Sequence, residues 1–343
     1  MKTSFNRPLD QGGFWDPKNE WYVYWRDRDG SIHGNNLVTP VNFAAIAYGL
    51  CDDPGRQRAI LDRMESEMQR EHLFTWPLNF FPYQREEGAD GNFPYPRYEN
   101  GDLFLSWDEV GIRAYAKQNP AVALKYIRSA LDRYEKDGLS FQRYLRQSQS
   151  GAGDDILAGN CMPIVGLYRD IYGLQPKPNR LYLEPHLTRE LDGAEIRYPL
   201  RGQLYVLKPG AEECSVTAGA CTLRAATPFA VNAIQNGLEY FSGTNGNATF
   251  TISRPNGAPL TVEILSWPED PALPRRWTES SSQAGSKTVH VIAQLQPDAL
   301  YELKANGRLL DSARSDHAGR AEFAYKRGSA SPQTLELMLK QSP

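Results

Sequence analysis

Four carboxylates lie within eleven residues in the stretch "YENGDLFLSWDEVG", residues 98–111. Two carboxyl groups, one protonated and one ionised, can serve as general acid and general base on opposite sides of a bond that breaks. Glu99 lies in an aromatic loop of this stretch, so it is a candidate acid or base. Asp108 starts an apolar run and is a second candidate, although the dipole of a helix would favour an anion there without any chemistry.

The two other carboxylates of this stretch have structural roles available to them. Ser106 and Glu109 form an S-x-x-E pattern, which predicts a capping box in which Glu109 bonds the backbone at the start of its helix. Asp102 follows a glycine and is expected in a turn. The stretch therefore predicts part of a site in which only some of the carboxylates do chemistry.

A later loop, "SGAGDDILAGN" at residues 150–160, offers another carboxylate pair. Its glycines allow the backbone to approach a ligand closely, and the adjacent charges of Asp154 and Asp155 could raise the pKa of one of them. The alternative is that Asp154 caps a short helix that begins at Asp155. Both residues are candidates for catalysis.

Aromatic content and charge suggest what such a site would bind. The chain has 7 Trp and 18 Tyr, and its net charge is -3, from 38 Lys and Arg against 41 Asp and Glu. This balance provides no basic field for nucleic acid, whereas flat aromatic faces suit an oligo- or polysaccharide. An aromatic residue at helical spacing can instead belong to a core. The candidate sugar-binding residues are Trp25, Asn35, Asn36, Trp76, Tyr98, Asn100 and Trp107.

Motifs for metals and cofactors are not found, so none is expected. The four cysteines form no CxxC pair; a disulfide between Cys214 and Cys221 is the alternative to buried free thiols. "DRDGSIHG" resembles the start of a calcium loop but lacks the later glutamate. Apolar runs are too short for a membrane span, and the first ten residues lack a signal-peptide core. The compartment stays open between a cytoplasmic protein and, if an N-terminal portion is absent, an exported one.

Helical periodicity extends to about residue 180, in segments of two kinds. Short, mostly apolar segments are typical of buried inner helices, and longer amphipathic ones of outer helices. The expected inner helices are 39–50, 106–118 and 160–173, and the outer ones are 53–72 and 119–138.

Connections into the expected inner helices are long, at roughly residues 12–38, 72–105 and 138–159. Loops of this length in a compact domain are usually functional or disordered. They are rich in Trp, Tyr, Phe, Asn and acids, so we expect them to form the walls of a cleft at the N-terminal ends of the inner helices. The helical domain is expected to span 1–180, followed by a β-rich linker or sheet at 181–246 and a small β-sandwich at 247–343.

Three segments carry a family resemblance: "NNLVTPVNFAAIAYGL", "YENGDLFLSWDEVGIRAYAK" and "AGNCMPIVGLYRDIYGLQPKPNRLYLEPHL". They resemble the C-terminal portion of six-hairpin, (α/α)6-barrel glycosidases, the class of trehalases, glucoamylases, α-L-rhamnosidases and debranching-type enzymes. The resemblance implies a partial (α/α)6 toroid followed by β-sandwich-type domains. It also implies hydrolysis mostly by inversion, with the general acid from the middle of the barrel and the base from a late loop.

The chain departs from that class in its number of helices. A complete barrel has six inner and six outer helices, whereas this sequence shows about three inner and two outer. Half a barrel would expose more apolar surface than a soluble monomer tolerates. We therefore expect a fragment, one subunit of a split enzyme, or an oligomer that completes its own barrel.

Two rival functions are compatible with the same residues. A polysaccharide lyase also combines a helical toroid with β-sheets, but needs a Tyr or His base beside an Arg or Asn that neutralises the uronate. A non-catalytic carbohydrate-binding or scaffold subunit would keep the aromatic residues and need none of the carboxylates.

Overall fold

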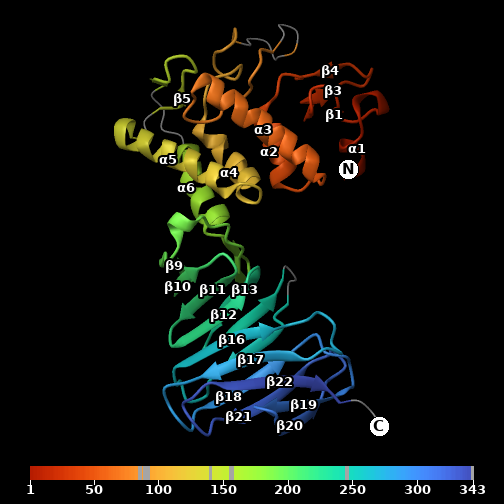
Figure 1. Cartoon of the computed structure of the whole chain (residues 1–343), viewed down its shortest axis with the longest axis vertical. Coiled ribbons are helices and arrows are strands. Elements are labelled where there is room, and N and C mark those ends of the chain that lie inside the picture. Colours follow the sequence, from red (N-terminus) through yellow and green to blue (C-terminus); the bar gives the residue numbers. More distant parts are fainter. Residues whose placement is uncertain (84–86, 88–92, 139–140, 154–157, 244–246, 341–343) are drawn as a thin grey trace. The chain divides into compact units, whose positions relative to one another are not determined.

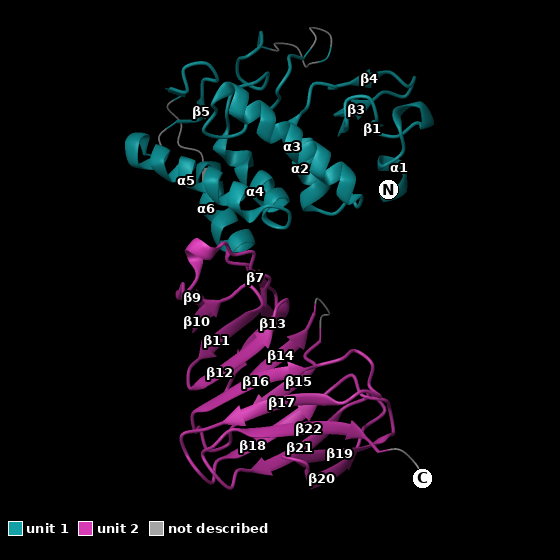
Figure 2. Cartoon of the chain, viewed as in Figure 1, with its two compact units in different colours: residues 1–171 teal, residues 172–343 magenta. Residues whose placement is uncertain are grey.

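The computed structural model describes residues 1–83, 87, 93–138, 141–153, 158–243 and 247–340 (Figure 1). The chain divides into two compact units, residues 1–171 and 172–343 (Figure 2). The first is helical with long loops, and the second consists of β-strands. The predicted order of a helical part followed by a β part is therefore confirmed.

Unit 1 contains the helices that the sequence predicts. Helices α2, α4 and α6 contact one another in chain order, and α5 packs against both α4 and α6. A π-helical turn over Leu167–Ile171 extends α6. The helices are α1 (Lys2–Phe5), α2 (Thr39–Ala47), α3 (Pro54–Glu71), α4 (Asp108–Ala116), α5 (Pro120–Asp137) and α6 (Met162–Gly166).

The start and the buried face of α3 follow from its sequence. Asp53 Oδ1 accepts hydrogen bonds from the backbone N–H groups of Gly55 and Arg56, and Pro54 occupies the first helical position. Ile60 and Met64, one turn apart, are fully buried. Burial of this stripe holds the helix in place, since helical propensity alone is a weak force.

The capping box expected at Ser106 and Glu109 is wrong. No side chain caps α4, because Glu109 instead pairs with Arg169, which also binds Asp170. Thr39 begins α2 but does not cap it, since its hydroxyl donates to the backbone carbonyl of Leu78 at 3.1 Å. Both side chains are used in contacts between segments that are distant in the sequence.

The long loops of unit 1 form three small antiparallel ribbons. These consist of β1 (Trp15–Asp16) with β2 (Trp21–Tyr22), β3 (Trp25–Arg26) with β4 (Ile32–His33), and β5 (Arg143–Tyr144) with β6 (Gly151–Ala152). Leu103 bridges to both Pro77 and Tyr144, which ties the loop before α4 to its neighbours.

Unit 2 consists of two sheets with a common hydrophobic core. Among the described residues, one sheet has the order β20-β19-β22-β17-β16-β12-β11-β10-β9 and the other β21-β18-β15-β14-β13-β8-β7. The strands are β7 (Leu174–Lys177), β8 (Arg180–Leu183), β9 (Ile196–Leu200), β10 (Gln203–Pro209), β11 (Glu213–Ala218), β12 (Cys221–Ala226), β13 (Phe229–Ile234), β14 (Gly237–Ser242), β15 (Phe250–Ser253), β16 (Leu260–Ser266), β17 (Arg275–Ser280), β18 (Lys287–Ile292), β19 (Leu300–Ala305), β20 (Arg308–Arg314), β21 (Ala321–Lys326) and β22 (Gln333–Leu339).

The β part differs from the division expected from the sequence. Parallel pairing of β12 with β16, which places Cys221 opposite Leu260, joins the expected segments 181–246 and 247–343 in one sheet. The unit also begins at Tyr172 instead of near 180, because β7 and β8 form a hairpin that pairs with β13. Pairing between distant strands, which has no local signature, thus produces one β unit in place of two.

The core of unit 2 contains a buried carboxylate with hydrogen-bond partners and two buried thiols. Glu279 is fully buried, receives a hydrogen bond from Trp277 Nε1 at 2.8 Å, and lies 2.5 Å from His290 Nε2. Burial would raise the pKa of Glu279, but His290 and Trp277 outweigh it and hold that pKa below its ordinary value. Cys214 and Cys221 are buried in β11 and β12 as free thiols, so they form no disulfide with each other.

The helices in the described part of the chain are all too short or too polar to cross a lipid bilayer.

Candidate functional site

A cavity of about 730 Å³ lies in unit 1 against the first turns of α2. Val38, Pro40, Val41 and Ala44 form an apolar wall, and the rest comes from the long loops. This is the place where the sequence predicts a cleft, at the N-terminal end of an inner helix. The lining residues are Tyr24, Trp25, Val38, Pro40, Val41, Ala44, Leu78, Tyr83, Glu87, Glu99 and Trp107.

Glu99 and Glu87 bring two carboxylates to this cavity. Glu99 Oε2 is buried and has no hydrogen-bond partner among the described residues, whereas Glu87 Oε1 accepts from the backbone N–H of Gly34 at 3.2 Å. Sequence reasoning singled out Glu99 but missed Glu87, whose only signal was its place in an acid-rich loop of the expected cleft wall. No Lys, Arg or His is among the described lining residues.

Trp25 and Trp107, both candidates from the sequence, line the cavity with Tyr24 and Tyr83. Trp107 is 50% exposed, and Trp25 stacks on His33 with ring centroids 4.6 Å apart and planes 15° from parallel. The flat apolar faces and polar edges of such rings suit a ligand that is apolar on one face and hydroxylated at its rim.

For a ligand of this shape, we expect Trp107→Ala to weaken binding by roughly tenfold, which corresponds to about 1.4 kcal/mol. The reason is that the mutation removes a flat wall of the cavity that is already half exposed. Titration calorimetry with a sugar as the ligand, on the wild type and the variant, measures this. Tyr48→Ala is the matched control, because Tyr48 is similarly exposed but does not line the cavity; equal losses in the two variants would contradict the prediction.

Asn35 and Asn36 are not among the lining residues, and both make structural contacts. Asn35 donates to Asp16 Oδ2 at 2.7 Å and accepts from Trp21 Nε1 at 2.7 Å. Asn36 is buried and donates to the carbonyl of Phe81 at 3.0 Å. Their side chains therefore hold the loop that leads into α2.

Trp76, Tyr98 and Asn100 are also outside the lining. Trp76 is buried, with its ring stacked on Tyr115 at 5.8 Å, so it is a core residue. Tyr98 packs edge-on against Phe104 at 5.7 Å. Asn100 is buried and bonds groups of the neighbouring loop segments. Tyr98 and Asn100 flank Glu99 and fix the backbone on either side of it.

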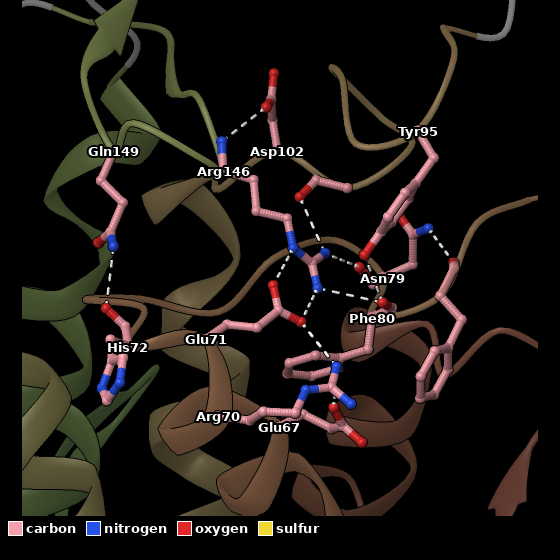
Figure 3. Close-up of polar contacts among 12 residues, drawn as sticks. Glu67, Arg70, Glu71, His72, Asn79, Phe80, Tyr95, Asp102, Arg146 and Gln149 are labelled. Carbon is pink, nitrogen blue, oxygen red and sulfur yellow. Dashed lines mark hydrogen bonds and ion pairs between the residues drawn. The ribbon is translucent and has the colours of Figure 1, made fainter.

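The guanidinium of Arg146 organises the loops around Glu99 (Figure 3). It is buried and forms a two-pronged ion pair with Glu71, with Nε–Oε2 and Nη2–Oε1 distances of 2.6 and 2.7 Å. Burial would raise the pKa of Glu71, but Arg146 outweighs it and lowers that pKa. The guanidinium also donates to the backbone carbonyls of Asn79, Phe80 and Gly101 at 2.6, 3.2 and 3.3 Å.

Asp102 adds a second anchor to the loop that carries Glu99. Its Oδ2 accepts from the backbone N–H of Tyr98 at 2.7 Å and from Arg143 Nε at 2.9 Å. Its Oδ1 accepts from the backbone N–H of Arg146 at 3.1 Å. The expected turn residue is thus a buried link between two loops, and Glu99 lies between fixed points on both sides.

Asp108 lies in the core rather than in the cavity lining. It is 2% exposed; its Oδ2 accepts from Thr75 Oγ1 at 2.6 Å, and its Oδ1 has no partner among the described residues. Burial raises the pKa of Asp108 well above its ordinary value, and the hydrogen bond from Thr75 only partly opposes this. The catalytic role expected of Asp108 stays a prediction.

We expect Asp108→Asn to raise the free energy of unfolding at pH 8 by about 1–3 kcal/mol, the cost of burying an unpaired charged group. Folding raises the pKa of Asp108. The contribution of this carboxyl to the stability of the wild-type protein is therefore fully present below its unfolded pKa of about 3.9 and is lost as the pH rises through its folded pKa. Denaturant unfolding of both proteins across pH 4–9 measures this. Asp132→Asn, on the exposed face of α5, is the control; a variant whose stability falls with pH as steeply as that of wild type would contradict the prediction.

Asp154 and Asp155 lie outside the described residues, so their catalytic roles stay predictions from the sequence. Within the described part of the chain, no three His, Cys, Asp or Glu side chains gather as they would around a metal ion. A second cavity, of about 520 Å³ in unit 2, is lined by Ser, Thr and small or apolar residues, and by no acid or aromatic residue among those described. A smaller cavity of about 230 Å³ in unit 1 is lined by Asp62 and Glu65, but by no tryptophan among the described residues. Of these three cavities, the one against α2 combines carboxylates with tryptophan side chains, and it is the cavity of unit 1 meant below.

The fold and the site define a helical unit with a carboxylate- and tryptophan-lined cavity, joined to a two-sheet β unit. No family model and no curated protein matches the sequence. Part of the chain is similar in structure to a GH63 mannosylglycerate hydrolase from Thermus thermophilus in complex with glucose, with 17% identity and a TM-score of 0.36 over 46% of this chain and 37% of that one.

A second structure of that hydrolase, with Tris and D-glycerate, gives 16% identity and a TM-score of 0.35 over 47% of this chain and 36% of the other. The chain thus spans little more than a third of the length of either match. The partial match is to a glycoside hydrolase, but a likeness of this extent assigns neither substrate nor residue roles.

Proposed function

We propose that the chain is a glycoside hydrolase, or a subunit of one, that cleaves glycosidic bonds at the cavity of unit 1. The observation that supports this most is the meeting of two carboxylates, Glu87 and Glu99, in one cavity walled by Trp25 and Trp107. Such a site can hold a sugar ring against aromatic faces and place acid groups at its edge.

In the proposed mechanism one carboxyl group protonates the leaving oxygen while the other, ionised, activates a water on the opposite face of the sugar. Glu99 and Glu87 are the pair that we propose, with Asp154 and Asp155 as the alternative source of the second carboxylate. Attack by water from the opposite face inverts the anomeric centre. Inversion also agrees with the partial (α/α)6 toroid that the sequence resembles.

A polysaccharide lyase is less well supported by the same cavity. A lyase needs a side chain that neutralises a uronate, and no Arg, Lys or His is among the described lining residues. A lyase also needs a base, for which Tyr83 is a candidate in this cavity. Burial raises the pKa of Tyr83, and the nearby Tyr24 and Glu87 raise it further. A tyrosine with a raised pKa is ionised even less at neutral pH and is a poorer base.

The first test is incubation of the full chain with a panel of neutral α- and β-linked disaccharides, followed by proton NMR during the first minutes. We expect release of a sugar whose anomeric configuration is opposite to that of the substrate. New ultraviolet absorbance from an unsaturated product would identify a lyase instead. Binding without turnover of any glycoside, by the particle from its own source as well as by the chain alone, would identify a non-catalytic sugar-binding subunit and refute the proposal.

We also propose that further helices complete the helical layer, from a second polypeptide or a second copy of this chain. The proposal rests on the partial toroid, and on the half-exposed side chains of Pro40, Val41 and Ala44 on α2. Native mass and peptide composition of the particle from its own source test it. A particle containing a single copy of this chain alone would contradict it.

A further inference from the structure

We propose that His33, which is not among the described lining residues of the unit 1 cavity, positions the ring of Trp25 as a stacking surface for a neutral sugar. The inference rests on the proposed function in that the ligand is a sugar, and it adds a positioning residue to that site. It is carried by the hairpin of β3 and β4, which brings the two rings together, and by the place of Trp25 in the lining.

The register of the hairpin places His33 against Trp25. The two residues are direct partners across β3 and β4, and the side chains of such partners lie on the same face of an antiparallel pair. Their rings are stacked, with centroids 4.6 Å apart and planes 15° from parallel. The imidazole therefore covers one face of the indole and prevents the indole from turning toward that side.

His33 is itself held in place by the turn of the hairpin. Its Nε2 lies 2.8 Å from Asp27 Oδ2, which fixes the edge of the imidazole. The backbone N–H of Asp27 donates to the carbonyl of Ser31 at 3.0 Å, and that of Gly30 donates to the carbonyl of Asp27 at 3.0 Å. A chain of contacts thus runs from Asp27 through His33 to the ring of Trp25 at the cavity.

The hairpin depends on contacts of this kind for its position. Each strand has only two residues, and a hairpin this small has little stability of its own. Arg26 Nη1 donates to two backbone carbonyls of segment 9–13, at 2.6 and 3.0 Å. Tyr24 lies 5.1 Å from Trp25 with the ring planes at 78°, and its backbone N–H donates to the carbonyl of His33 at 3.2 Å.

A fixed indole is a better surface for a sugar than a mobile one. Stacking of a ligand on a ring that is already held costs less conformational entropy than stacking on a ring that must first be ordered. Loss of the imidazole removes the support from one face of Trp25. The affinity of the cavity therefore depends on a residue that does not line it.

The experiment measures binding of maltose and of cellobiose, one α-linked and one β-linked, to the full chain by titration calorimetry. We expect Trp25→Ala to weaken binding of at least one of them by about tenfold. His33→Ala should weaken the same binding by about threefold to tenfold, the range that corresponds to one stacked aromatic pair. His33→Phe keeps a flat ring and should bind within about twofold of wild type.

Ile32→Ala is the matched control for the stability of the hairpin. Ile32 is the neighbour of His33 in β4 and is 37% exposed, and successive side chains of a strand point to opposite faces. Its loss should leave sugar affinity unchanged. Equal losses in Ile32→Ala and His33→Ala would overturn the inference, because they would show that any weakening of the hairpin has the same effect.

Two further readouts separate positioning from a general structural role. In the Trp25→Ala background, His33→Ala should weaken binding no further, because the ring that it positions is gone. With 5-fluorotryptophan incorporated, the fluorine resonance of Trp25, assigned by its loss in Trp25→Phe, should shift in His33→Ala without any sugar, while the other tryptophan resonances stay. Additive losses, an unmoved Trp25 resonance, or no binding of either disaccharide by wild type would overturn the inference.

The outcome is separable from that of the proposed function. If His33→Ala weakens binding through Trp25 but no glycoside is hydrolysed, the hydrolase proposal fails and the positioning role stands. If glycosides are hydrolysed and His33→Ala binds sugar as wild type does, the positioning role fails and the hydrolase proposal stands.

Discussion

Glu99→Gln is expected to lower the rate of glycoside hydrolysis by about 10²–10⁴-fold, the usual contribution of a positioned acid or base. The amide has nearly the shape of the carboxylate but can neither give nor take the proton. Because Glu99 is only partly buried and its loop is held by other residues, the variant should remain folded and still bind sugar. Single-turnover kinetics and calorimetry on the same sample measure the two effects separately.

The comparison variants are Glu87→Gln and Glu135→Gln. If Glu87 is the second carboxylate of the pair, its amide should lose activity to a similar degree, whereas Glu135→Gln on the exposed face of α5 should keep wild-type rates. Substrates with very good leaving groups need little protonation. They should therefore restore turnover in whichever variant lacks the acid.

Full activity of Glu99→Gln would remove Glu99 from the mechanism. In that case hydrolysis should be lost in Asp154→Asn or in Asp155→Asn, because these two residues are the alternative source of a catalytic carboxylate. Full activity in all of these variants would favour a non-catalytic role for the chain.

Arg146→Met is expected to destabilise unit 1 by about 3–5 kcal/mol, the cost of removing one partner of a buried ion pair. Methionine keeps the apolar stem but removes the Arg146 donors from the Glu71 carboxylate and from three loop carbonyls. Arg70 still reaches Glu71, and the Tyr95 hydroxyl still donates to Phe80. Hydrolysis should fall as well, because the carbonyl of Gly101, two residues after Glu99, loses its contact with the guanidinium.

Hydrogen exchange of the full chain, read by mass spectrometry, measures this effect with an internal reference. Peptides of unit 1 should lose protection, while those of unit 2 should not. Arg70→Met is the matched control: Arg70 contacts the same Glu71 carboxylate at 3.1 Å but has a 58% exposed side chain, so its loss should cost less than about 1 kcal/mol. Similar losses in the two variants would show that burial of Arg146 does not matter.

A double variant tests the coupling directly. Once Arg146 is gone, Glu71→Gln removes the charge that was left buried, so Arg146→Met/Glu71→Gln should be more stable than Arg146→Met alone. A double variant whose losses simply add would contradict the coupling between the two groups.

The helices of unit 1 and the strands of unit 2 could be predicted from local patterns alone. Proline stands in the first turn of α3 and of α5, and buried and exposed residues alternate along strands such as β18. These signals reside in a few neighbouring residues. Sequence reasoning also selected Glu99, Trp25 and Trp107, all three of which line the cavity.

The sequence by itself thus determined the order of the elements, their amphipathic faces and the loops that supply much of the cavity lining. Only the tertiary structure decided which loop residues line the cavity and which hold it together. Arg146 meets Glu71 from 75 positions away, and β12 meets β16 across a long connection, so no local pattern encodes either contact. Burial of Asp108 and the arrival of Glu87 at the cavity likewise depend on how distant segments pack, because a side chain's environment is set by its neighbours in space.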